Sequence, residues 1–136
     1  MRVQPPPALR ALLALTDVGF VLYWSVTALA AAKVVAIPEA YLYKGYHDPT
    51  LVAWNWSFAP LDLAASAFGF AALAMLARGK TWRGLAIVSL VLTSVAGGMA
   101  ISFWAIEGDF DWSWWAPNLF LFAWPWLYLP KLIAAT

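Results

Sequence analysis

GLAIVSLVLTSVAGGMAISFWAI, residues 84–106, is a run without a single charged side chain. A helix needs about 20 apolar residues to cross the hydrocarbon core of a bilayer, so this run is long enough to span it. Two further runs, residues 11–32 and 51–77, are equally apolar, and one aspartate interrupts each of them. A shorter run, residues 112–129, contains two prolines but no charge. The sequence therefore predicts four membrane-spanning helices.

The composition of the 136-residue chain agrees with this prediction. Hydrophobic residues make up 64% of the chain and charged residues only 11%, whereas an ordinary soluble domain carries about 25% charged residues. We expect an all-α fold, an integral membrane four-helix bundle in which residues 1–136 form a single transmembrane domain. The expected helices cover about residues 8–33, 51–77, 83–106 and 112–130, with an outer loop at 34–50.

The charges are distributed unevenly between the two sides of the predicted bundle. The amino terminus, the second connection and the carboxyl terminus share one side and carry Arg2, Arg10, Arg78, Lys80, Arg83 and Lys131. By the positive-inside rule this side is cytoplasmic. The other two connections are net acidic, with Glu39, Asp48, Glu107, Asp109 and Asp111 against Lys33 and Lys44. The sequence therefore predicts a multi-pass protein of the cell's inner (cytoplasmic) membrane with both termini in the cytoplasm.

Asp62 is the most unusual residue of the second run, where it lies within WNWSFAPLDL, residues 54–63. A charged residue at the centre of a spanning helix costs about 2.5–3.5 kcal/mol on insertion scales, so it is expected to face other helices or water and to have a partner. The residues that share its helix face are Asn55, Ser66 and Gly69. Pro60 also removes one helical hydrogen bond. The segment predicts a kinked, partly hydrated polar notch that faces the bundle interior.

Two further carboxyls are candidates for acid–base chemistry. Asp17 lies nearer the predicted cytoplasmic end, on the order of 10 Å from Asp62 along the axis, which allows a relay through Thr16, Tyr23 or water. Glu107 ends the third helix and leans over the predicted bundle mouth. Because carboxyls in unlike surroundings can divide the roles of acid and base, we expect Asp62, Glu107 and Asp17 to be catalytic. Alternatively, the aspartates only tie helices together, and Glu107 belongs to a solvated loop.

Tryptophan is unusually frequent, with ten in the chain. Several of these residues suit an aromatic belt at the membrane interface. They would equally form the walls of a box around an apolar or cationic ligand, since aromatic faces attract cations. The expected ligand-binding residues are Trp54, Asn55, Trp56, Trp104, Trp115, Asn118, Tyr23 and Trp24.

The remaining features bear on cofactors and partners. The chain has no cysteine, which excludes disulfides, thiolate catalysis and cysteine-ligated metals. His47 is the only histidine and makes a weak case for a metal, so we expect neither a metal nor a cofactor. Small residues four apart, Ser94, Gly98 and Ser102, let helices approach closely, either within the bundle or in a homodimer. The expected partners are the lipid bilayer and a lipophilic small molecule, without nucleic acid.

These observations favour a protein that binds a lipophilic molecule in an outward-opening pocket lined by carboxylate and tryptophan side chains. Its chemistry would be cofactor-free acid–base work such as isomerisation, cyclisation or epoxide opening. One alternative is a small proton-coupled transporter or multidrug exporter, in which an intramembrane carboxylate exchanges protons against a cation. The other is a non-catalytic accessory subunit whose polar groups serve only helix packing.

Three segments resemble the YvaD family of bacterial four-helix membrane proteins. They are LTDVGFVLYW (15–24), IPEAYLYKGYHDPTLVAWNWSFAPLDL (37–63) and FWAIEGDFDWSWWAPNLFL (103–121). The resemblance covers most of the chain, and its long middle segment is specific. It implies the four-helix topology, but it transfers no catalytic residue, because the family is described only as uncharacterised membrane proteins.

Overall fold

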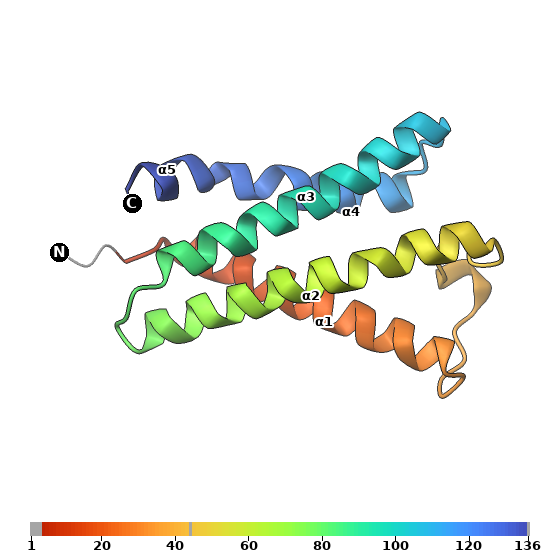
Figure 1. The fold of residues 1–136 in the computed structure, drawn as a ribbon, viewed down its shortest axis with the longest axis horizontal. Coiled ribbons are helices and arrows are strands. Elements are labelled where there is room, and N and C mark those ends of the chain that lie inside the picture. Colours follow the sequence, from red (N-terminus) through yellow and green to blue (C-terminus); the bar gives the residue numbers. More distant parts are fainter. Residues whose placement is uncertain (1–3, 44, 136) are drawn as a thin grey trace.

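The computed structural model describes residues 4–43 and 45–135, and within them the chain is all-helical with no strand (Figure 1). The elements in chain order are α1 (Pro7–Ala31), η1 (Glu39–Tyr41), α2 (Pro49–Ala77), α3 (Arg83–Glu107), α4 (Trp112–Ala123), η2 (Trp124–Leu127) and α5 (Leu129–Ala134). The last three follow one another and form the fourth helical segment of the bundle. The expected all-α fold with four helical segments is therefore confirmed.

Helix boundaries follow local chemistry that the sequence displays. Asp48 and Asp111 cap α2 and α4, each accepting a hydrogen bond from the backbone N–H two residues later, at 2.8 and 2.9 Å. Gly108 ends α3 in the left-handed conformation with φ of 76°, which glycine adopts without a steric penalty. Asp48 of the first connection and Asp111 of the third connection therefore have a structural role at helix N-termini.

The fourth segment differs from the single helix expected over residues 112–130. Regular α-helix stops at Ala123, a 3-10 turn follows, and α5 continues to Ala134. Pro125 lies in the 3-10 turn, and it has no N–H to donate to the preceding turn. The side chain of Trp124 is buried at this break. The proline therefore divides the segment without ending its course along the bundle.

The small-residue face of α3 packs against the fourth segment of the same chain. A Cβ atom at Gly97 would lie 2.5 Å from the carbonyl oxygen of Asn118 and 2.6 Å from the backbone nitrogen of Phe122. The Ser94 hydroxyl donates a 2.9 Å hydrogen bond to the carbonyl of Phe122. The close approach expected from the sequence thus occurs inside the bundle. A dimer through this part of α3 would have to displace α4.

All four helical segments contribute to one apolar core. It consists of Leu9, Leu13, Ala72, Ala86, Leu90, Trp124, Leu129 and Leu132. These residues belong to the beginning of α1, the end of α2, the beginning of α3 and the η2–α5 region. This core closes the end of the bundle at which α1 begins and α5 ends (Figure 1).

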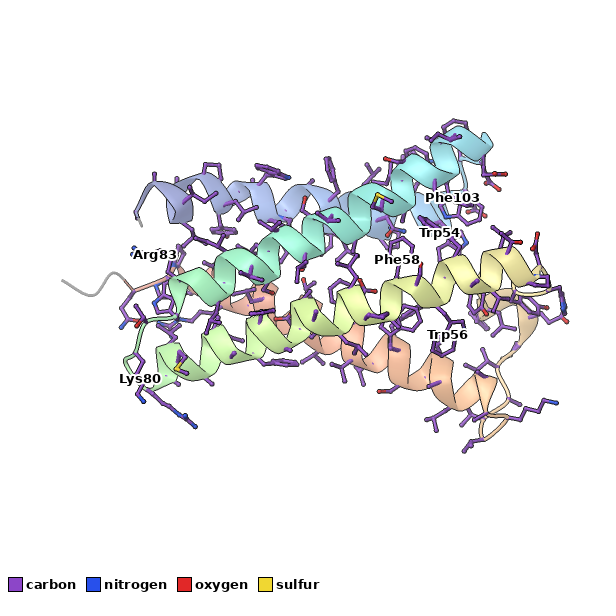
Figure 2. The ribbon with its side chains drawn as sticks, viewed as in Figure 1. Trp54, Trp56, Phe58, Lys80, Arg83 and Phe103 are labelled. Carbon is purple, nitrogen blue, oxygen red and sulfur yellow. The ribbon has the colours of Figure 1, made fainter. Side chains whose placement is uncertain are left out.

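The two ends of the bundle carry opposite charges. The closed end, which we call the basic end, carries Arg10, Arg78, Lys80, Arg83 and Lys131. Figure 2 shows Lys80 and Arg83 there, around the α2–α3 turn. The opposite end, which we call the acidic end, carries Glu39, Asp48, Glu107, Asp109 and Asp111. Antiparallel packing therefore places most basic residues at one end of the bundle and most acidic residues at the other, as the sequence pattern predicts.

Three helices, α1, α2 and α3, are long and apolar enough to cross a membrane. Their outward faces are apolar as well, because Leu15, Leu22 and Met99 are 67%, 59% and 49% exposed. Soluble monomers rarely expose large contiguous apolar patches, whereas apolar side chains on the surface of a membrane protein contact lipid. The fold therefore has the dimensions and the surface that a membrane protein requires.

Candidate functional site

The partner of Asp62 is a residue of α1. Asp62 is buried, and its Oδ2 accepts a 2.9 Å hydrogen bond from the indole Nε1 of Trp24. The Trp24 ring packs against Trp56 with a centroid separation of 5.3 Å and meets Tyr23 edge-on at 5.0 Å. The other carboxyl oxygen of Asp62, Oδ1, is buried without a hydrogen-bond partner. One oxygen of this carboxyl is thus held by Trp24, and the other is buried with its hydrogen-bonding capacity unused.

Asp17 occupies a separate place in the same α1–α2 interface. Its side chain is fully buried, and neither carboxyl oxygen has a hydrogen-bond partner. A Cβ atom at Gly69 would overlap this carboxyl group and would lie 2.9 Å from the hydroxyl oxygen of Ser89. The Ser66 hydroxyl donates a 3.0 Å hydrogen bond to the main-chain carbonyl of Asp17. The face that Asp62 shares with Ser66 and Gly69 therefore packs directly onto α1.

A cavity of about 590 Å³ lies between α1, α2, α3 and α4, next to residues 40–43 of the first connection. This volume falls in the range of small-molecule sites. Aromatic side chains supply much of its wall, namely Phe20, Tyr23, Trp24, Trp54, Phe58, Trp104, Trp114 and Phe120. Its polar wall residues on the helices are Thr16, Asn55, Asp62, Ser113 and Asn118. The cavity is thus mainly apolar, with a few polar groups.

Three of the residues that line the cavity each have one buried polar atom without a hydrogen-bond partner among the described residues. These atoms are Oγ1 of Thr16, Nδ2 of Asn55 and Oδ1 of Asp62. Asn55 uses only its oxygen, which accepts a 3.4 Å hydrogen bond from the hydroxyl of Tyr23. Buried polar groups are nearly always paired, so each exception needs an explanation. A ligand or ordered water in the cavity would supply the missing partners.

An aromatic cluster supports the cavity wall between α2 and α3. Trp54 stacks on Phe103 with a centroid separation of 4.4 Å and meets Phe58 edge-on at 4.7 Å. Figure 2 shows these three rings together, at the opposite end of the bundle from Lys80 and Arg83. Aromatic pairs of this kind are worth about 0.5–1.5 kcal/mol beyond their buried area. Aromatic contacts therefore join α2 and α3 at the cavity wall.

Four of the residues singled out from the sequence lie outside the cavity wall. Asp17 is sealed between helices, and Trp56 packs behind Trp24. The indole of Trp115 donates a 2.8 Å hydrogen bond to the carbonyl of Asp109, which fixes the third connection. Glu107 is exposed at the last residue of α3. Asp62 is consequently the one carboxyl group among the residues that line this cavity.

The other seven candidates, Tyr23, Trp24, Trp54, Asn55, Asp62, Trp104 and Asn118, all line the cavity. The structure adds wall residues that sequence reasoning did not select, among them Phe58 and Trp114. Each precedes a selected residue by four positions, Asp62 and Asn118 respectively, and therefore lies on the same helix face. The helical repeat is the signal that would have found them.

His47 belongs to no cluster of metal ligands. Its Nε2 lies 3.9 Å from a carboxylate oxygen of Glu39, and both side chains are 81% exposed. Among the described residues, no three histidine, aspartate or glutamate side chains come together as a metal site would require.

Within the described residues, three helices long and apolar enough to cross a membrane and a mainly apolar cavity lined by one carboxyl side chain define a small all-helical protein. The chain belongs to the "Family of unknown function (DUF5360)", which it matches over residues 9–136. It is similar to "Uncharacterized protein YvaD" of Bacillus subtilis (strain 168), with 39% identity over 119 residues that cover 87% of this chain and 86% of the relative. The resemblance to the YvaD family is thereby confirmed. No solved structure matches the chain significantly.

Proposed function

We propose that this protein resides in the membrane and binds a lipophilic small molecule in the cavity between its four helical segments. The observation that carries the proposal is a largely aromatic cavity wall in which three residues each have a buried polar atom without a partner among the described residues. Apolar walls with a few convergent polar groups are typical of small-molecule sites. Asp62 is the central group, because Trp24 orients one carboxyl oxygen and leaves the other for the ligand.

The same proposal assigns an orientation to the bundle. The basic end would face the cytoplasm, since positively charged connections are retained there. The cavity would then open toward the outer half of the bilayer, where residues 40–43 and the start of α4 contribute to its wall. Separation of the two charge classes by antiparallel packing supports this orientation.

Acid–base turnover in this cavity would depend on Asp62 as the proton donor. Glu107 does not reach the cavity wall, so the division of roles between two carboxyls lacks geometric support. Tyr23 also has a hydroxyl group among the wall residues, and this hydroxyl donates a hydrogen bond to Asn55. The arrangement supports binding more directly than it supports isomerisation, cyclisation or epoxide opening.

The two rival functions have less support. A transporter needs access from both sides, and the apolar core around Leu90 and Trp124 closes the basic end in this conformation. An accessory subunit whose polar groups serve helix packing would pair those groups with one another. The unpartnered atoms of Thr16, Asn55 and Asp62 do not follow that pattern.

The test is to purify the protein in mild detergent and identify co-purifying lipophilic molecules by mass spectrometry. Asp62→Asn keeps an oxygen for the Trp24 hydrogen bond but replaces the free acceptor by a donor, so it should lose or exchange the ligand. Trp112→Phe, at a 72% exposed position outside the cavity, is the control and should retain it. If wild type and Asp62→Asn carry the same bulk phospholipid, the proposal fails. A ligand altered equally by Glu107→Gln would revive the two-carboxyl scheme.

A further inference from the structure

The cavity opens sideways, between the first and fourth helical segments. Its wall residues on α2 and α3 are all buried or half-buried. On α1 and α4, by contrast, several wall residues are exposed to the outside of the bundle, including Leu15 at 67%, Tyr23 at 41% and Phe120 at 44%. A residue that both lines the cavity and faces outward marks an opening. One opening therefore lies on the α1–α4 side, in addition to the one at the first connection, where the wall residue Tyr41 is 81% exposed.

Helix packing explains why the bundle is open there. The principal helix contacts join α1 to α2, α2 to α3, and α3 to the fourth segment, so α1 and α4 are the outer members of the series. Gly19 lies on the cavity wall of α1, and a Cβ atom added to it would meet nothing within 4 Å. We call this opening the α1–α4 slot and define it by Leu15, Gly19, Pro117 and Phe120, all exposed wall residues.

The slot is apolar and lies at depth. Leu15 lies eight residues after the start of α1, and Phe120 lies eight residues after the start of α4, which begins at the opposite end of the bundle. Each interval corresponds to about 12 Å along the helix axis at 1.5 Å per residue. None of the four residues that define the slot has a polar side chain. In a protein that spans the membrane, an opening of this kind faces hydrocarbon. A ligand in the cavity therefore need not fit entirely within it.

Asp62 determines which polar group the ligand needs. Asp62 lines the same cavity as the slot, and its Oδ1 is a buried acceptor without a donor among the described residues, which a ligand reaches once the side chain turns toward it. Aromatic side chains make up much of the cavity wall, and no lysine, arginine or histidine among the described residues lines it. A hydrogen-bond donor on the ligand would satisfy this oxygen, because leaving a buried polar group unpaired costs stability.

We propose that the ligand is a membrane amphiphile with a hydrogen-bond-donating end, a hydroxyl or an amine, and a single long hydrocarbon chain. The donating end binds Asp62, and the chain leaves the cavity through the α1–α4 slot into the bilayer. This inference rests on the proposed function and adds to it the ligand class and the route of entry. The hydroxyl and the amine have in common that each donates a hydrogen bond. The competition experiment distinguishes between these two head groups.

The experiment uses the full chain in lipid nanodiscs with a photoreactive probe, a hexadecanol carrying a diazirine near the middle of its chain, the part that would pass through the slot. Mass spectrometry maps the adducts, which should concentrate on Leu15, Phe120 and their neighbours rather than on lipid-facing Leu22 or Met99. Competition with hexadecanol, hexadecylamine and hexadecyl methyl ether reports the head group. The methyl ether lacks a donor, so it should compete about tenfold more weakly than the better of the other two.

Matched glycine variants test the slot. Gly19→Leu fills it, while Gly84→Leu makes the same change at an exposed α3 position outside the cavity, where an added Cβ likewise meets nothing within 4 Å. Gly19→Leu should lower the ratio of hexadecanol to hexanol binding by about tenfold, and Gly84→Leu should not change it. An unchanged ratio in Gly19→Leu, or adducts spread evenly over lipid-facing residues, would overturn the slot. An equally competitive methyl ether would overturn the donor. If wild type binds neither the alcohols nor hexadecylamine, this ligand class is overturned, whereas the proposed function itself fails only if wild type and Asp62→Asn carry the same bulk phospholipid.

Discussion

The indole nitrogen of Trp24 lies 2.9 Å from Oδ2 of Asp62 and donates a hydrogen bond to it across the α1–α2 interface. Seven residues before Trp24, Asp17 lies against Gly69, seven residues after Asp62. The two aspartates therefore occupy two levels of one antiparallel helix pair. At one level Asp62 lines the cavity and accepts a hydrogen bond from Trp24. At the other level the absence of a side chain at Gly69 leaves space for the carboxyl group of Asp17.

Trp24→Phe should destabilise the protein by about 1–3 kcal/mol, since it leaves both oxygens of the buried Asp62 carboxyl without a protein donor. The change appears as a lower midpoint of thermal unfolding in detergent. Trp112→Phe, at an exposed position, is the control and should leave the midpoint nearly unchanged. A double-mutant cycle with Asp62→Leu isolates the hydrogen bond. If the two changes are additive in that cycle, the bond contributes nothing to stability.

Gly69→Ala should destabilise the α1–α2 pair by about 1–3 kcal/mol, because the added methyl group would overlap the Asp17 carboxyl. Asp17→Ala in the same chain should recover most of the loss by vacating that space. Gly84→Ala meets nothing within 4 Å and serves as the control, with a gain of at most about 1 kcal/mol from helix propensity. Unfolding in detergent measures all three. Failure of Asp17→Ala to compensate would show that the two residues do not share this space.

Gly97→Ala and Gly98→Ala should differ although the two glycines are adjacent. At Gly97 the new methyl group meets backbone atoms of Asn118 and Phe122, at 2.5 and 2.6 Å, which move only if α4 moves. At Gly98 it meets only the ring of Phe122, at 3.0 and 3.2 Å, and a side chain can rotate away. We expect Gly97→Ala to cost about 1–3 kcal/mol more. Equal midpoints of thermal unfolding would contradict the close α3–α4 contact.

The proposed orientation can be measured with single cysteines, because the chain contains none. Lys80→Cys lies in the α2–α3 turn at the basic end, and Ile106→Cys lies at an 86% exposed position near the acidic end. In intact cells, a membrane-impermeant maleimide should label Ile106→Cys and reach Lys80→Cys only after permeabilisation. The opposite pattern would place the acidic end in the cytoplasm, and labelling of both without permeabilisation would contradict membrane insertion.

Much of the candidate site follows from helical periodicity. The face that joins Asn55, Asp62, Ser66 and Gly69 was readable from their spacing, and the structure packs that face inward. Capping by Asp48 and Asp111 is likewise local chemistry. These features involve residues within a few turns of one another, so the chain displays them without knowledge of its fold.

Glu107 shows where such reasoning stops. Its position at the end of the third helix suggested that it leans over the bundle mouth. In the structure α3 ends at Glu107 and its side chain is exposed. Trp115 shows the same limit, because its indole bonds to the carbonyl of Asp109 instead of lining the wall. The direction of a side chain at a helix end depends on the neighbouring connection, whose path is set by the packing of other elements.

Length, apolar runs and charge pattern by themselves determined that the chain forms four helical segments with a basic and an acidic end, because each of these properties is local. Only the tertiary structure decided that Trp24 holds Asp62, that Asp17 is sealed against Gly69, and that the cavity opens between α1 and α4. These relationships join residues far apart in sequence, 38 positions in the case of Trp24 and Asp62. They depend on how the helices pack side by side, which the pattern within any one helix does not specify.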